Sequence, residues 1–153
     1  MKDDFGRTID YMRISLTDRC NMRCVYCMPA SGVKKIPHDD ILTYDEIIRL
    51  VRIASEHGVR RVRLTGGEPL VRLHVDDLVR GIASVDGIED ISLTTNGMLL
   101  PRHGKALREA GLTRVNISLD TLDPDKFHQV TRVGQLQDTL DGIKAAIDEG
   151  FNP

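Results

Sequence analysis

An alternating segment runs directly into three cysteines in the stretch Tyr11-Met-Arg-Ile-Ser-Leu-Thr-Asp-Arg-Cys20-Asn-Met-Arg-Cys24-Val-Tyr-Cys27. Apolar and polar side chains alternate over residues 11–17, which is the period-two pattern of a β-strand. The cysteines therefore follow the carboxyl end of the predicted strand, and α/β barrels place their active sites at that end. The chain has no other cysteine.

Three thiolates in one short loop can hold three irons of a cubane iron–sulfur cluster. The fourth iron then lacks a protein ligand, so it can bind and activate a substrate. Three cysteines so close together cannot all pair with one another. A metal or cluster in a reducing, cytoplasmic setting fits them better than a disulfide scaffold does. A structural zinc site completed by His38 remains the alternative interpretation.

The composition excludes several classes of protein. A chain of 153 residues, with 41% hydrophobic and 29% charged residues, is typical of one globular domain. The formal net charge of −2 provides no basic field for nucleic acid. The N-terminus has no apolar signal sequence, and no apolar run reaches about 18 residues, so we expect no membrane span.

Strand-like and helix-like segments alternate along the chain. We expect strands at 11–17, 61–65, 90–95 and 114–119. We expect helices from the capping box Thr43-Tyr-Asp-Glu46 to Gly58, at 74–85 and 102–110, from Asp123-Pro124, and from Leu136 to just before Gly150. Repeated strand–helix order predicts an α/β fold with a parallel sheet and outer helices, either as an open sheet or as a barrel.

Polar residues occupy every second position of all four expected strands. Parallel strands covered on both faces are usually almost continuously apolar. We therefore expect the apolar side chains to pack on helices and the polar ones to share the opposite face. Such a face could simply be solvated, or it could line a barrel that binds a polar ligand. Repetition over four strands, two of them with arginine, favours the barrel.

Polar turns follow the strands. They are Thr65-Gly-Gly-Glu-Pro69, Thr94-Thr-Asn-Gly97 and Ser118-Leu-Asp120. The two glycines would let the backbone approach a ligand closely and would leave N–H groups accessible. Glu68 beside them could pair with an ammonium group. We expect all four strand ends to lie on one rim, together with the cysteines.

The cysteine spacing and the Gly-Gly-Glu-Pro turn together resemble the radical S-adenosylmethionine superfamily, including the aromatic Tyr26 before the last cysteine. Within it, four stretches resemble the GTP 3′,8-cyclase family, which begins molybdenum cofactor biosynthesis. These stretches are residues 10–20, 63–72, 93–97 and 114–123. The resemblance covers residues 5–153 and implies a single domain over 1–153, with the first four units of a partial TIM-type barrel, ending before the fifth strand.

The resemblance implies ligands for individual residues. A 4Fe-4S cluster would be held by Cys20, Cys24 and Cys27. S-adenosylmethionine would be contacted by Tyr26, Gly67 and Ser118, and GTP by Arg13, Arg63 and Thr94. A 5′-deoxyadenosyl radical would then take a hydrogen atom from the ribose C3′ of GTP, and that carbon would attack C8 to give 3′,8-cyclo-7,8-dihydroguanosine triphosphate. Structural roles stay open, because strand arginines commonly form salt bridges and Ser or Thr can cap turns.

This chain differs from the family in its length. The family's GTP cyclases continue into a second three-cysteine cluster that binds guanine, and no cysteine is left here for it. We therefore expect an N-terminal fragment with weak or absent turnover. The edge of its fourth strand would be covered by the missing half or by another chain. That other chain could be a second copy of this one, in a homo-oligomer. Another radical enzyme with a different substrate, or a non-catalytic iron–sulfur or zinc module, are the alternative functions.

Overall fold

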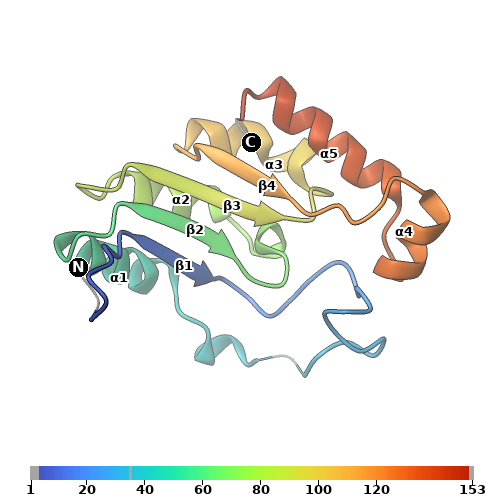
Figure 1. Cartoon of the computed structure of the whole chain (residues 1–153), viewed down its shortest axis with the longest axis horizontal. Coiled ribbons are helices and arrows are strands. Elements are labelled where there is room, and N and C mark those ends of the chain that lie inside the picture. The colour runs from blue at the N-terminus through green and yellow to red at the C-terminus, as the bar shows by residue number, and fades with distance from the viewer. Residues whose placement is uncertain (1–3, 35, 152–153) are drawn as a thin grey trace.

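The computed structural model describes residues 4–34 and 36–151. Its four strands form one parallel sheet in the order β1-β2-β3-β4. Their bounds are Tyr11–Ser15 (β1), Arg61–Thr65 (β2), Asp90–Thr95 (β3) and Arg114–Ile117 (β4). All four arrows in Figure 1 point the same way. Each strand therefore pairs with its neighbour along the chain, as successive strand–helix units produce.

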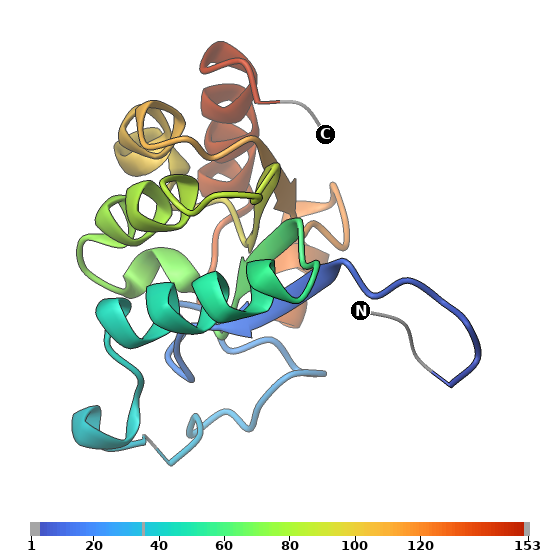
Figure 2. The ribbon, with the colours of Figure 1, turned by 90° about the vertical axis from the view of Figure 1, so that its left-hand side faces the viewer.

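Four helices pack side by side on one face of the sheet, in the order α1-α2-α3-α5. They are Tyr44–Glu56 (α1), Val75–Ala83 (α2), Leu100–Glu109 (α3) and Leu136–Asp148 (α5). Figure 2, which looks along the layer of strands, shows them on one side. The remaining elements are α4, Pro124–Thr131, and two short 3-10 turns, His38–Asp40 (η1) and Pro69–Val71 (η2).

Local sequence signals set most of the helix starts. The capping box is present, with Thr43 accepting from the Glu46 N–H and the Glu46 carboxylate accepting from the Thr43 N–H. The Asp123 side chain caps α4. The helix expected from residue 102 begins two residues earlier, with Pro101 in its first turn. Proline is tolerated there because the first-turn N–H groups have no intrahelical acceptor.

The two faces of the sheet differ as the alternation predicts. The central apolar side chains are buried beneath the helices: Val62, Leu64, Ile91 and Leu93. On the opposite face, the strand register places Arg13 beside Arg63, and Arg63 beside Ser92. The cysteine loop and α4 lie at the carboxyl ends of the strands, next to this polar face (Figure 1). Among the residues that the structure describes, no helix has the length and apolar character needed to span a membrane.

Candidate cluster and ligand site

The three cysteines lie on the loop that follows β1, and all three are free thiols. Cys20 and Cys24 are partly buried and Cys27 is exposed. A tight turn joins the second pair, because the N–H groups of Cys27 and Met28 both donate to the Cys24 carbonyl, at 2.9 and 3.1 Å. The loop is anchored by Met22, which is buried against Phe127 and Leu136. The sequence prediction that the cysteines follow the first strand is confirmed.

The three cysteines are of the residue type that binds iron–sulfur clusters. Burial raises the pKa of the Cys20 and Cys24 thiols, and the neighbouring Cys27 raises both further. Thiols in such a position become thiolates when a cation coordinates them. Within the described part of the chain, no three Cys, His, Asp or Glu side chains converge closely enough to hold a metal ion as they stand. The side chain of His38, the ligand of the zinc alternative, lies outside what the structure describes.

The glycine turn after β2 is packed under the cysteine loop. A Cβ at Gly67 would lie 2.2 Å from the Arg19 carbonyl oxygen, and one at Gly66 would lie 2.7 Å from that of Thr17. The Gly67 N–H donates to the Thr17 carbonyl, and the Glu68 N–H donates to the Arg19 carbonyl, both at 2.7 Å. The prediction of an accessible N–H group is therefore wrong for Gly67. Gly67 itself remains exposed at the rim.

Glu68 joins two strand ends. Its side chain is 1% exposed. One carboxylate oxygen accepts from the Leu70 N–H and the Thr95 hydroxyl, and the other accepts from the Asn96 N–H at 2.8 Å. Burial raises the pKa of Glu68, and these three donors oppose the rise. The expected contact between this carboxylate and a ligand's ammonium group stays a prediction, and in this structure both oxygens join the ends of β2 and β3.

Asn96 is a residue of this site that the sequence analysis missed. Its side-chain amide donates to the Asn21 Oδ1 at 2.6 Å and lies 4.0 Å from the Cys20 Sγ. Its backbone N–H is the one held by Glu68. A chain of contacts therefore links the Gly-Gly-Glu-Pro turn to the first cysteine. The available signal is the polar Thr94-Thr-Asn-Gly97 strand end, from which the sequence analysis assigns a ligand contact to Thr94 and none to Asn96.

The predicted S-adenosylmethionine contacts come from three elements of the rim. Tyr26 lies in the cysteine loop, and its hydroxyl donates to the Asp120 carboxylate at 2.8 Å. That bond brings the loop to the end of β4, where Ser118 is exposed two residues before Asp120. Gly67 is at the end of β2. These contacts stay predictions, and the structure places all three residues at the carboxyl end of the sheet.

The predicted GTP contacts lie on the polar face. Arg61 pairs with Asp10 at 2.7 Å and Arg114 pairs with Asp90, so the salt-bridge alternative holds for these two arginines. Arg63 instead donates to the Ser92 hydroxyl at 3.3 Å and lies over the Tyr11 ring.

Among the described residues, neither Arg13 nor Arg63 has a carboxylate within ion-pair distance. Thr94, the third predicted contact, is half-buried next to Asn116. Arg13 is exposed and Arg63 is half-buried, and neither charge is neutralised by an acid of the described residues.

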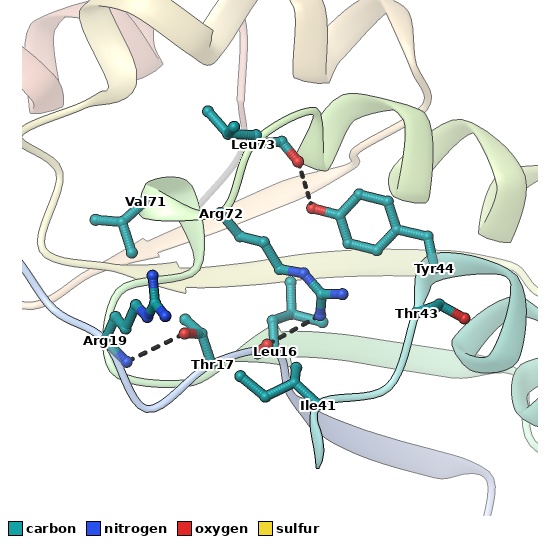
Figure 3. A pocket seen from close by; sticks show the side chains of 9 residues that line it. All are labelled: Leu16, Thr17, Arg19, Ile41, Thr43, Tyr44, Val71, Arg72 and Leu73. Carbon is teal, nitrogen blue, oxygen red and sulfur yellow. Dashed lines mark hydrogen bonds between the residues drawn. The ribbon is translucent and has the colours of Figure 1, made fainter. Parts of the chain in front are cut away.

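A pocket of about 450 Å³ lies beside this rim rather than on the polar face (Figure 3). Two of its polar side chains, those of Tyr44 and Arg72, already have partners within the protein. The Tyr44 hydroxyl donates to the Leu73 carbonyl, and the Arg72 guanidinium donates to the carbonyls of Leu16 and Leu42 while stacking on the Tyr44 ring at 4.3 Å. The Arg72 bonds connect Leu16 and Leu42, which lie near the two ends of the segment between β1 and α1, and the pocket surrounds these bonds. A smaller pocket of about 350 Å³ reaches Cys20.

Comparisons with known proteins agree with this geometry. The family model described as the radical SAM superfamily matches residues 14–153. The whole chain is 52% identical to a GTP 3′,8-cyclase of Petrotoga mobilis and 54% identical to one of Pelotomaculum thermopropionicum. It covers 47% of each, so the chain spans about half the length of the curated relatives it matches.

Two solved structures share the fold. Streptococcus suis SuiB bound to S-adenosylmethionine matches with a TM-score of 0.72 at 20% identity, over 94% of this chain and 31% of that one. Methylornithine synthase matches with a TM-score of 0.70 at 17% identity, over 96% of this chain and 44% of that one. The predicted α/β architecture, the first part of a TIM-type barrel, is therefore confirmed.

Proposed function

The chain belongs to the radical S-adenosylmethionine superfamily, and from this premise we propose that it carries the cluster-bearing part of a GTP 3′,8-cyclase. The observation that carries the proposal is the pair Arg13 and Arg63. They lie side by side in register and have no carboxylate partner in the described structure. A rim with three free thiols adjoins their face. That arrangement suits an anionic nucleotide held below a cluster.

We assign each residue one task. Cys20, Cys24 and Cys27 would hold a 4Fe-4S cluster, and Tyr26, Gly67 and Ser118 would position S-adenosylmethionine at its open side. What the cluster supplies, when bound, is the electron that cleaves S-adenosylmethionine to the 5′-deoxyadenosyl radical, which takes a hydrogen atom from GTP. Arg13 and Arg63 would bind the triphosphate with charge-assisted hydrogen bonds. Thr94 would contact the same nucleotide from β3. Residues 1–153 would form one domain working in the reducing cytoplasm, where thiols stay reduced.

Anaerobic reconstitution tests this proposal on the 153-residue chain. We expect a brown protein that binds iron and sulfide and whose reduced-cluster EPR signal changes when S-adenosylmethionine is added. A colourless protein that binds one zinc ion would refute the proposal. A cluster whose EPR signal responds to S-adenosylmethionine, in a chain that shows no GTP binding, would indicate a radical enzyme with another substrate.

Arg63→Ala should weaken GTP binding and leave the cluster in place. The lost guanidinium makes charge-assisted hydrogen bonds, which contribute about 1.5–3 kcal/mol each, so we expect Kd for GTP to rise by roughly 10- to 100-fold. Equilibrium binding of GTP to the reconstituted chain measures the change. Arg61→Ala is the matched control, because Arg61 lies on the same strand and face but is paired with Asp10. Equal weakening in both variants, or loss of iron in Arg63→Ala, would mean that Arg63 is structural.

A further inference from the structure

One side chain holds both flanks of the second cysteine pair. The Nη1 of Arg132 donates to the Arg23 carbonyl and to the Met28 carbonyl, both at 2.8 Å. Arg23 directly precedes Cys24, and Met28 directly follows Cys27. The distance between these two carbonyls is therefore fixed by a single guanidinium nitrogen that comes from the end of α4.

The backbone next to Arg132 adds two more contacts with the loop. The Arg23 N–H donates to the Thr131 carbonyl at 3.0 Å, and the Val25 N–H donates to the Val130 carbonyl at 2.9 Å. The last carbonyls of a helix have no intrahelical donor, so they are available to another segment. The cysteine loop takes this role at the carboxyl end of α4.

Arg132 adopts an unfavourable backbone conformation at this point. Its φ is 65°, and in the part of the chain that the structure describes, His74 is the only other non-glycine residue with a positive φ. A residue with a Cβ holds such a conformation where its surroundings fix it, and such positions cluster at functional sites. The contacts that fix it here are those with the cysteine loop and the bond from its own N–H to the His128 carbonyl at 2.7 Å.

The charge of Arg132 is not neutralised by an acid. Both acceptors of its guanidinium are neutral carbonyls, and no carboxylate lies within ion-pair distance among the described residues. A cation beside an iron–sulfur cluster stabilises the more negative, reduced state and so raises its reduction potential. Arg132 can thus act on a bound cluster through loop geometry and through charge.

We propose that Arg132 is a positioning residue of the cluster site, which sets the spacing of Cys24 and Cys27 and favours the reduced cluster. The effect on the reduction potential rests on the proposed function, whereas the effect on the geometry of the cysteine loop does not. The test uses Arg132→Gln, which removes the charge, and Arg132→Lys, which keeps it. Arg108→Gln is the matched control, because Arg108 also donates to a backbone carbonyl, that of Leu112, and lies on α3.

The two bonds from Arg132 to the Arg23 and Met28 carbonyls form a clamp on the cysteine loop. Amide hydrogen exchange of the cluster-free chain tests this clamp. In Arg132→Gln we expect the amides of residues 23, 25, 27 and 28 to exchange faster by about tenfold or more, the factor given by one lost hydrogen bond to a charged group. Arg108→Gln should leave them unchanged. Equal exchange in both variants would overturn the clamp, whether or not a cluster can be assembled.

Potentiometric titration of the reconstituted chain tests the charge. We expect a lower midpoint potential in Arg132→Gln than in the wild type, restored toward the wild-type value in Arg132→Lys. A potential that is the same in all three chains, or is lowered equally by Lys and Gln, would overturn the electrostatic role. A wild-type chain that takes up no cluster would refute the proposed function, and the exchange measurement would still decide the clamp.

Discussion

Gly67→Ala is expected to unseat the cysteine loop and to lower the free energy of unfolding by about 3 kcal/mol, the upper end of the usual overpacking range. The new Cβ would lie 2.2 Å from the Arg19 carbonyl oxygen and 2.7 Å from its carbon. These are backbone atoms, so no side-chain rotation relieves the overlap. The same carbonyl accepts the Glu68 N–H at 2.7 Å, so a shift of residue 19 breaks that bond. Denaturant unfolding of the cluster-free chain measures the effect.

The matched control for this prediction is Gly104→Ala, in α3. A Cβ there would lie 3.5 Å from the Glu149 Cγ and 4.0 Å from the Phe151 Cε2, which are ordinary contacts. Alanine in a helix interior is more stable than glycine by up to about 1 kcal/mol, so this variant should be unchanged or slightly more stable. A Gly67→Ala chain as stable as Gly104→Ala, with the same iron content after reconstitution, would contradict the close packing of Gly67 against the Arg19 carbonyl.

The strand alternation allowed both the sheet and its polar face to be predicted. In a parallel sheet, register partners on neighbouring strands point to the same face, so alternation along every strand gives the sheet two different faces. Arg13 and Arg63 meet for this reason, as direct register partners. The position of Cys20 at the carboxyl end of the sheet was also predictable, because its loop directly follows the first strand. Local caps such as Thr43 and Asp123 were predictable because their partners are two or three residues away.

Glu68 and Arg132 could not be assigned from sequence, since their partners are distant along the chain. Glu68 accepts from Asn96, 28 residues away, and Arg132 donates to Arg23, 109 residues away. A glutamate after two glycines suggested a ligand contact, yet the fold brings the end of β3 close enough to use both oxygens. Nothing near residue 132 predicts that α4 stops beside the cysteine loop.

Cys24→Ala should abolish iron retention after anaerobic reconstitution. The remaining thiols would be Cys20, which is partly buried, and Cys27, which is exposed. Two thiolates leave half of a cubane's four irons without a protein ligand, where the wild type leaves one. We expect iron and sulfide per chain to fall to background, and the EPR signal of the reduced cluster to disappear.

Val25→Ala distinguishes a lost ligand from a disturbed loop. Val25 lies next to Cys24, its side chain is 51% exposed, and its N–H bond to the Val130 carbonyl does not depend on the side chain. We expect this variant to keep wild-type iron content. Both variants should unfold within about 1 kcal/mol of the wild type without the cluster, because exposed and half-exposed positions outside the main core tolerate small truncations. Full iron retention in Cys24→Ala would place the cluster elsewhere and refute the assignment of this loop.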